Sequence, residues 1–171
     1  MVIWIVGLSG SGKTTIGAKL AVALRSNGRP TVIVDGDDMR KIFARDINIS
    51  NYQVSERRLN AERIVEICRW LDTQGVNVVC SILCIFNDIL MRNRELYADY
   101  LQVELTTPLA VVEKRDVKGI YKAYNDGKMR HVVGKDIKYP EILNSDLRFN
   151  TANSSNLDKI VEEIISQVLH D

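Results

Sequence analysis

Cysteine, proline and aromatic residues are all scarce in this sequence, and neither sign of charge dominates. Among its 171 residues are 3 Cys, 3 Pro and 6% aromatic residues, and the formal net charge is +1. A balanced charge excludes the strongly basic surface that favours nucleic-acid or membrane binding, so we expect neither partner. The odd cysteine count, at Cys68, Cys80 and Cys84, shows no paired metal-binding spacing. These residues are therefore expected to be reduced thiols in a cytoplasmic protein.

Long hydrophobic runs are missing as well. The apolar run at 2–6 is too short for a signal-peptide core, and no stretch approaches the length of a membrane span. With 46% hydrophobic residues, the chain has enough apolar side chains to bury a core. The length and the lack of a linker predict one domain over 1–171.

Short apolar runs alternate with amphipathic stretches along the chain. Alternation of this kind predicts an α/β fold in three layers, with a mainly parallel sheet covered by helices on both faces. Cys68, Cys80, Trp4 and Trp70 are expected to pack in the core. The expected strands cover residues 2–6, 31–35, 76–83, 100–106 and 146–150. The expected helices cover 13–26, 38–45, 55–74 with Ser55 as N-cap, 87–98, a segment starting at Pro108, and 156–169.

The segment 115–145 differs from the rest because it is polar, charged and glycine-containing. This composition is typical of a mobile region over a site rather than of core. We therefore expect a mobile lid at about 115–140.

The stretch "GLSGSGKTT" at 7–15 follows the first apolar run and precedes a helical pattern. It is a complete phosphate-binding loop: its glycines let backbone N–H groups converge on an anion, and the helix N-terminus adds to the field. In this pattern Lys13 reaches the β- and γ-phosphates, and the Thr14 hydroxyl binds Mg²⁺. The sequence therefore predicts a P-loop NTPase fold that uses ATP and Mg²⁺.

The loop alone leaves open whether the protein is a switch, a motor or a kinase. The Asn-Lys-x-Asp element typical of guanine-binding switches does not occur, and the third predicted strand ends in "CSILC", without the carboxylate of a large ATPase. Small size and a polar lid segment favour a small-molecule kinase.

Acidic residues follow the second predicted strand, where open α/β sheets bind their ligands. Phosphoryl transfer needs Mg²⁺ ligation and a carboxylate near the acceptor hydroxyl, and Asp35 and Asp37 could supply both. Arg40 could hold an anionic acceptor. Asp38 fits the alternative of an acidic first turn that caps the helix.

At this point the chain resembles the adenylylsulfate kinase family, whose members move the γ-phosphate of ATP to a ribose 3′-hydroxyl. The shared motifs run almost from end to end. They are "GLSGSGKTT", "DGDDMR" at 35–40, "YQVSERRLN" at 52–60, "TPLAVVEKRDVKGIYKAYNDGK" at 107–128, "VVG" at 132–134 and "KYPE" at 138–141. The long motif at 107–128 is the specific part, since many unrelated enzymes share the phosphate loop.

The resemblance implies roles for individual residues and a homodimer. It implies a catalytic set of Lys13, Asp35 and Asp37, with Asp37 as the better candidate for the base, and a metal site at Thr14 and Asp35. ATP would contact Gly7, Ser9, Gly10, Ser11, Gly12, Lys13, Thr14, Thr15, Arg115 and Lys118. The acceptor would contact Asp37, Arg40, Tyr52, Arg57, Asn60, Cys84, Ile85, Phe86, Lys122 and Val132. For Tyr52, Arg57, Lys118 and Lys122, an ordinary surface role is the alternative.

The sequence departs from the family at the acceptor side. Val132 replaces a base-stacking Phe, Cys84 replaces a Ser, and Ala123 and Asn125 replace lid cations. A one-sided clamp predicts a smaller base, and the chain looks closest to a branch that phosphorylates cytidine diphosphoramidate for bacterial capsule phosphoramidate. Adenylylsulfate is the alternative acceptor. A kinase of another small metabolite and a nucleotide-binding regulatory module without turnover are more distant alternatives.

Overall fold

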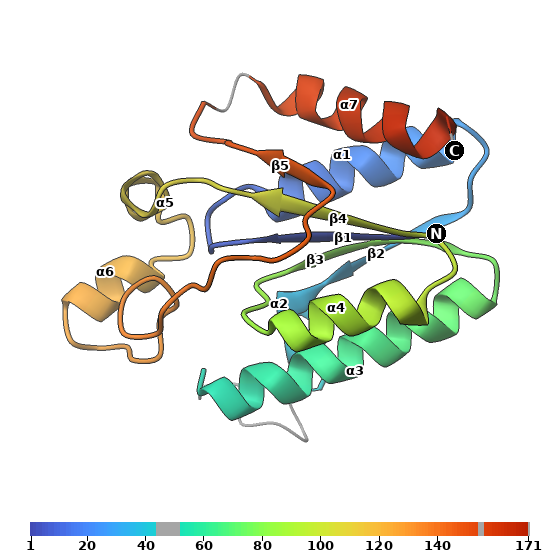
Figure 1. Ribbon diagram of the computed structural model, residues 1–171. Coiled ribbons are helices and arrows are strands. Elements are labelled where there is room, and N and C mark those ends of the chain that lie inside the picture. The colour runs from blue at the N-terminus through green and yellow to red at the C-terminus, as the bar shows by residue number, and fades with distance from the viewer. Residues whose placement is uncertain (44–51, 154–155, 171) are drawn as a thin grey trace.

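A five-stranded parallel sheet forms the centre of the computed structural model, which describes residues 1–43, 52–153 and 156–170. The strands are β1 (Val2–Gly7), β2 (Thr31–Asp35), β3 (Asn77–Ile82), β4 (Tyr100–Leu105) and β5 (Leu147–Phe149). Their order across the sheet is β2-β3-β1-β4-β5 (Figure 1). Because every pairing is parallel, all the strands end at the same edge of the sheet.

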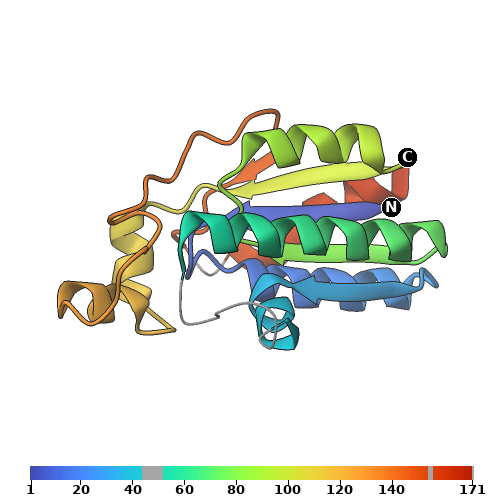
Figure 2. The same cartoon turned by 90° about the horizontal axis from the view of Figure 1, so that it is seen from below.

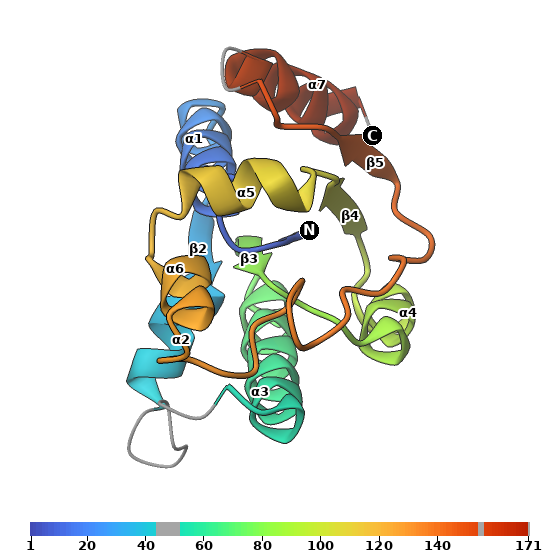
Figure 3. The ribbon, with the colours of Figure 1, turned by 90° about the vertical axis from the view of Figure 1, so that its left-hand side faces the viewer.

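Helices cover both faces of this sheet, as the sequence predicts. In Figures 1 and 2, α1 and α7 lie on one face and α3 and α4 on the other. Figure 3 looks onto the carboxyl ends of the strands, in front of which α5 and α6 lie. The helices are α1 (Lys13–Ser26), α2 (Gly36–Ile42), α3 (Val54–Thr73), α4 (Asn87–Leu96), α5 (Leu109–Arg115), α6 (Ile120–Asn125) and α7 (Leu157–His170).

The central strand β1 shows why the sheet is buried on both faces. Its side chains alternate in direction, so Trp4 packs with the α3 and α4 side chains, whereas Ile3 and Ile5 pack with those of α1 and α7. A strand that is covered on both faces reads as a continuous apolar run, which is the pattern of residues 2–6. The three-layer α/β prediction is confirmed.

Two helix starts differ from the prediction. The carboxylate of Asp35 accepts a hydrogen bond from the Asp37 amide, so α2 begins at Gly36 rather than at 38. It ends at Ile42 with Phe43 as its C-cap, and residues 44–45 of the predicted helix lie outside the described residues. Helix α3 begins at Val54, and no side chain caps it, so the Ser55 cap is wrong.

The two tryptophans occupy opposite environments. Trp4 is fully buried, as expected, but 63% of Trp70 is exposed, so the prediction of a core Trp70 is wrong. The buried residues of α3 include Ile64, Val65 and Cys68, and a residue six positions after Ile64 points away from that face.

The predicted lid contains more packed structure than its composition indicates. Within it lies α6, and Tyr121, Val132 and Val133 are buried against Leu8 and Val112 in a small apolar cluster of their own. The expectation that this segment contributes no core is therefore wrong, whereas its mobility stays a prediction.

The cysteines and the membrane prediction can also be compared with the described residues. Cys68, Cys80 and Cys84 are free thiols and all three are buried.

In the part of the chain that the structure describes, no helix combines the length and apolarity needed to cross a bilayer.

Candidate active site

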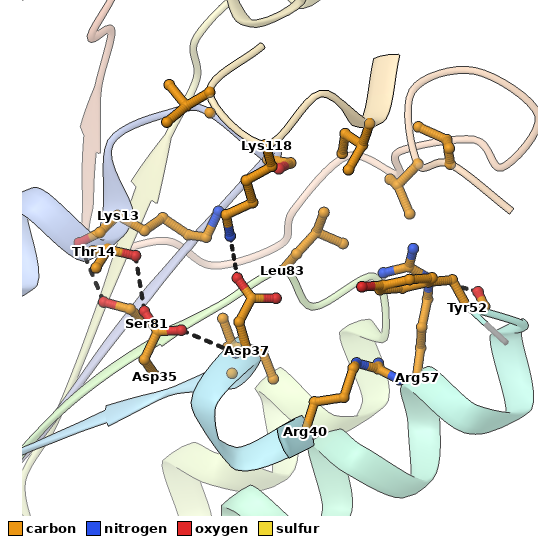
Figure 4. Close-up of a pocket in the computed structure, with 18 of the residues that line it drawn as sticks. Lys13, Thr14, Asp35, Asp37, Arg40, Tyr52, Arg57, Ser81, Leu83 and Lys118 are labelled. Atoms are coloured by element: carbon orange, nitrogen blue, oxygen red, sulfur yellow. Dashed lines mark hydrogen bonds and ion pairs between the residues drawn. The ribbon is translucent and has the colours of Figure 1, made fainter. Parts of the chain in front are cut away.

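A cavity of about 410 Å³ lies at the carboxyl ends of β1, β2 and β3. Figure 4 shows side chains from the phosphate loop, α2, α3 and the predicted lid pointing into it. Most of the predicted residues line its wall: Ser9, Gly10, Gly12, Lys13, Thr14, Thr15, Asp35, Asp37, Arg40, Tyr52, Arg57, Asn60, Lys118 and Val132. The fold therefore brings together segments that are far apart in the sequence.

The phosphate loop is already shaped for an anion. Gly10 and Gly12 have φ angles of +79° and +97°, a region that residues with a Cβ rarely adopt. Among the described residues, the amides of Gly10, Gly12, Lys13 and Thr14 have no protein acceptor, and all four residues line the cavity. Convergent free amides at a helix N-terminus form a binding site for phosphate.

Lys13 lies beneath this loop. Its Nζ donates to the carbonyl oxygens of Gly7 at 2.9 Å and Leu8 at 2.8 Å, and no carboxylate pairs with it within the described chain. Desolvation by burial, aided by the charge of Lys118, lowers the pKa of Lys13 to about 8. A partly buried ammonium that pairs with no carboxylate in the described chain would be stabilised by a phosphate in the cavity.

Thr14 and Asp35 form a candidate Mg²⁺ site. The Thr14 hydroxyl donates to the Asp35 carboxylate at 2.8 Å, and Asp35 pairs in register with Ser81 on the neighbouring strand β3. A hydroxyl and a carboxylate are hard oxygen ligands, as Mg²⁺ requires. Within the described residues no cluster of three or more His, Cys, Asp or Glu could hold a metal by protein ligands alone. This sparse set fits Mg²⁺, which takes its other ligands from phosphate and water.

Asp37 lies between the phosphate loop and the pair Arg40 and Arg57 (Figure 4). Its carboxylate forms an ion pair with Lys118, which extends from the predicted lid segment (Figure 4). Desolvation by burial would raise the pKa of Asp37, but the hydrogen bond and charge of Lys118, with Lys13 and Arg40, outweigh it and hold the pKa below its usual value. Asp37 is therefore ionised at neutral pH and able to accept a proton.

Two guanidinium groups lie on the side of the cavity away from the phosphate loop (Figure 4). Arg40 and Arg57 both lie over the Tyr52 ring, at 5.0 and 5.3 Å from its centroid. Only 7% of Arg40 is exposed, and its Nη1 has no hydrogen-bond acceptor within the described chain. Desolvation by burial, together with the charge of Arg40, lowers the pKa of Arg57 to about 10. Two close cations, one with an unpartnered buried N–H, favour an anionic ligand between them and the phosphate loop.

Asn60 and Arg57 are held by backbone carbonyls near this ligand space. Arg57 donates from Nε to the Tyr52 carbonyl and from Nη2 to the His131 carbonyl, both at 2.9 Å. The Asn60 amide donates to the Gly36 carbonyl at 3.3 Å, and its buried Oδ1 has no donor among the described residues. These bonds link α3 to α2 and to the lid across the cavity.

Several predicted contact residues lie outside the cavity wall. Strand β3 ends at Ile82; the next residue, Leu83, lines the cavity, whereas Cys84 is fully buried with its thiol against the Phe86 carbonyl. The structure thus does not bring Cys84, Ile85 or Phe86 to the cavity. Lys122 is exposed and pairs with Asp126. Gly7, Ser11 and Arg115 support the phosphate loop from behind rather than line the cavity.

The cavity wall also includes residues that sequence reasoning missed. Most of them are apolar, and an apolar residue in the sequence ordinarily indicates the core rather than a binding site. They are Ser81, Ile82, Leu83, Val117, Ile120, Met129 and Val133, together with Gly36. The position of Ser81 at a parallel strand end was the one available signal.

Comparisons with known proteins agree with this geometry. The family model described as adenylylsulphate kinase matches residues 1–150. Curated adenylyl-sulfate kinases are similar over almost the whole chain: one from Gloeothece citriformis is 34% identical, with 98% of this chain and 91% of the relative covered. One from Pseudomonas aeruginosa is also 34% identical, covering 96% and 83%.

A solved structure has the same arrangement of elements. The APS kinase of Mycobacterium tuberculosis, in complex with AMPPNP and APS, superposes with a TM-score of 0.88 at 27% identity, covering 98% of this chain and 96% of that one. Family model, relatives and fold agree: the chain belongs to the adenylylsulfate kinase family and is an α/β P-loop kinase that transfers a phosphoryl group to a hydroxyl group.

Proposed function

We propose that this kinase transfers the γ-phosphoryl group of ATP to the ribose 3′-hydroxyl of adenylylsulfate. The observation that carries the proposal is the guanidinium of Arg40 beside that of Arg57: its buried Nη1 has no hydrogen-bond acceptor among the described residues, which favours an anionic acceptor facing the phosphate loop. The names of the relatives, and the APS bound to the Mycobacterium tuberculosis enzyme, support this acceptor among anionic nucleotides.

On the donor side, the free amides of the phosphate loop and the Lys13 ammonium would bind the β- and γ-phosphates of ATP. Thr14 and Asp35 would hold Mg²⁺, which supplies further neutralisation of phosphate charge when bound. Lys13 would stabilise charge that develops on the transferring group, and this interaction matters most in a desolvated site.

On the acceptor side, Asp37 would orient the 3′-hydroxyl and accept its proton. The ion pair between Asp37 and Lys118 is half-exposed, so breaking it contributes only a small free-energy penalty when Lys118 contacts a phosphate instead. Within the predicted lid at about 115–140 of the single domain 1–171, the Lys118 side chain would leave Asp37 and contact the transferring group, and the lid would exclude water as a competing acceptor.

A second candidate acceptor is cytidine diphosphoramidate. The observation that favours it is Val132, which lines the cavity together with Met129 where the resemblance places a stacking Phe. An aliphatic side chain offers less stacking area to a purine than an aromatic ring does. Tyr52 would then stack a smaller base from one side.

An ADP-release assay with Mg-ATP distinguishes the two acceptors. We expect fast release with adenylylsulfate, slower release with cytidine diphosphoramidate or CDP, and a blank rate without acceptor. Replacing Arg40 with Gln should raise KM for the acceptor by about tenfold or more while KM for ATP changes little, because a charged hydrogen-bond partner is removed.

The control for this assay is Lys41→Gln, which removes a neighbouring cation that pairs with Asp38 at the surface and should change neither constant. Turnover of the cytidine compound without turnover of adenylylsulfate would reverse the order of the two candidates. No release with any acceptor would contradict both. The expected homodimer stays a prediction that light scattering can test.

A further inference from the structure

The backbone carbonyls of the phosphate loop are all accounted for by donors. Lys13 donates to those of Gly7 and Leu8, and the amide of Ile16 donates to that of Gly12. The three carbonyls between them have donors from outside the loop. Tyr121 on α6 donates its hydroxyl to Ser9 at 3.1 Å, Arg115 at the end of α5 donates to Gly10 at 3.4 Å, and Thr151 after β5 donates to Ser11 at 2.6 Å.

These donors determine where the loop amides point. A peptide unit is planar and trans, so a carbonyl held in one direction turns the next residue's N–H in the opposite direction. The hydrogen bond from Tyr121 to the Ser9 carbonyl therefore directs the Gly10 N–H away from α6. The hydrogen bond from Thr151 to the Ser11 carbonyl likewise directs the Gly12 N–H away from Thr151. Both amides lack a protein acceptor in the described chain, and both residues line the cavity.

The Gly10 carbonyl belongs to a different part of the loop. The amide of its peptide unit is that of Ser11, which donates to Leu8 at 3.2 Å and closes a turn. Arg115 therefore supports the turn, and it also donates to the carbonyls of Thr151 and Ala152. Arg115 therefore links the segment after β5 to the loop, in addition to the direct hydrogen bond from Thr151 to Ser11.

Both hydroxyl donors are fixed by their surroundings. Tyr121 and Thr151 are each only 1% exposed. The Thr151 hydroxyl has one hydrogen, which it gives to Ser11, so Thr107 after β4 must donate to Thr151 in their shared hydrogen bond. Buried hydroxyls whose partners are all protein atoms keep one geometry, and the loop is thereby preorganised.

We propose that Tyr121 and Thr151 are positioning residues for the triphosphate of the donor, acting through the carbonyls of Ser9 and Ser11. The proposal deepens the proposed function on its ATP side and rests on the phosphate loop binding phosphate, not on the identity of the acceptor. It also gives the helix α6 of the predicted lid a direct bond to the loop.

The test measures binding of inorganic tripolyphosphate with Mg²⁺, and of adenosine, by calorimetry. Thr151→Val replaces the hydroxyl with a methyl group, and Tyr121→Phe removes the hydroxyl. Each should raise the dissociation constant for tripolyphosphate about three- to tenfold, and the double variant should raise it further. The dissociation constant for adenosine should not change, because adenosine has no phosphate to bind the loop amides.

Two matched variants separate positioning from loss of packing. Thr151→Ser keeps the hydroxyl and should keep the wild-type affinity. Tyr124→Phe removes a hydroxyl from the same helix α6, and that hydroxyl has no hydrogen-bond partner among the described residues, so affinity should not change.

The proposal is overturned if Thr151→Val and Tyr121→Phe both bind tripolyphosphate within twofold of wild type. It is equally overturned if Thr151→Ser binds as weakly as Thr151→Val, or if adenosine affinity falls in step. Should Thr151→Val fail to fold, Tyr121→Phe with Tyr124→Phe decides the result alone. Because none of these measurements uses an acceptor, an error in the proposed acceptor leaves their outcome unaffected.

Discussion

Replacing Asp37 with Asn is expected to lower kcat by about 10²- to 10⁴-fold, the usual contribution of a positioned acid–base group. KM for ATP should change only a few-fold, because the donor contacts lie on the phosphate loop and on Asp35. The physical reason is that Asn cannot accept the proton of the acceptor hydroxyl, although it keeps the shape of the side chain. Steady-state kinetics with both substrates varied measures the two constants separately.

Asp38→Asn is the matched control for this substitution. Asp38 is the next residue on the same short helix, but it pairs with Lys41 at 2.9 Å on the surface and does not line the cavity. Its kcat should stay within about twofold of wild type. If Asp37→Asn retains wild-type kcat, Asp37 is not the proton acceptor, whatever the control does.

The affinity for Mg-ATP should fall as the pH rises above about 8, by up to about tenfold per pH unit. Burial lowers the pKa of Lys13 to about 8 in the nucleotide-free protein, so its ammonium is lost above that pH. Bound phosphate favours the charged form and raises this pKa. At a pH above about 8, binding of Mg-ATP therefore requires Lys13 to take up a proton. The affinity for Mg-ATP falls as the pH rises because protons become scarcer in solution.

Calorimetry in buffers of different ionisation enthalpy measures this proton uptake directly. The uptake should approach one proton per ATP between about pH 9 and pH 10, and it should be near zero at about pH 6.5. In Lys13→Met the affinity should be weak throughout, and its decrease above about pH 8 should disappear. A wild-type affinity that stays constant up to about pH 10 would show that Lys13 keeps its proton in the free protein.

The sequence predicted the layers of this fold because its strands carry a simple signal. Runs such as that at 2–6 are apolar throughout, and that pattern requires burial on both faces. Trp70 shows where the signal fails: an aromatic side chain was assigned to the core by its type, although its position on α3 points away from Ile64. Helix α6 is only six residues long, too short for a periodic pattern within a polar segment.

The candidate site was predictable where chemistry is concentrated in motifs. Asp35 is the last residue of β2, and Lys13 and Asp37 come after the ends of β1 and β2, so topology alone gathers them at one edge of the sheet. Tyr121 and Thr151 were not predictable as supports of the loop, because each contacts a backbone carbonyl, and any residue supplies a carbonyl. Cys84 was misplaced because a motif match says nothing about which neighbour in an extended segment faces the cavity.

The contrasting environments of the two tryptophans give this protein a built-in optical reporter. Trp70 is in contact with solvent and open to collisional quenchers such as acrylamide, whereas Trp4 is shielded on all sides. A Trp70→Phe variant would leave Trp4 as the single tryptophan, on the strand that leads directly into the phosphate loop. Changes in its tryptophan fluorescence lifetime on addition of nucleotide would then report on the packed interior behind the phosphate loop, without any attached dye.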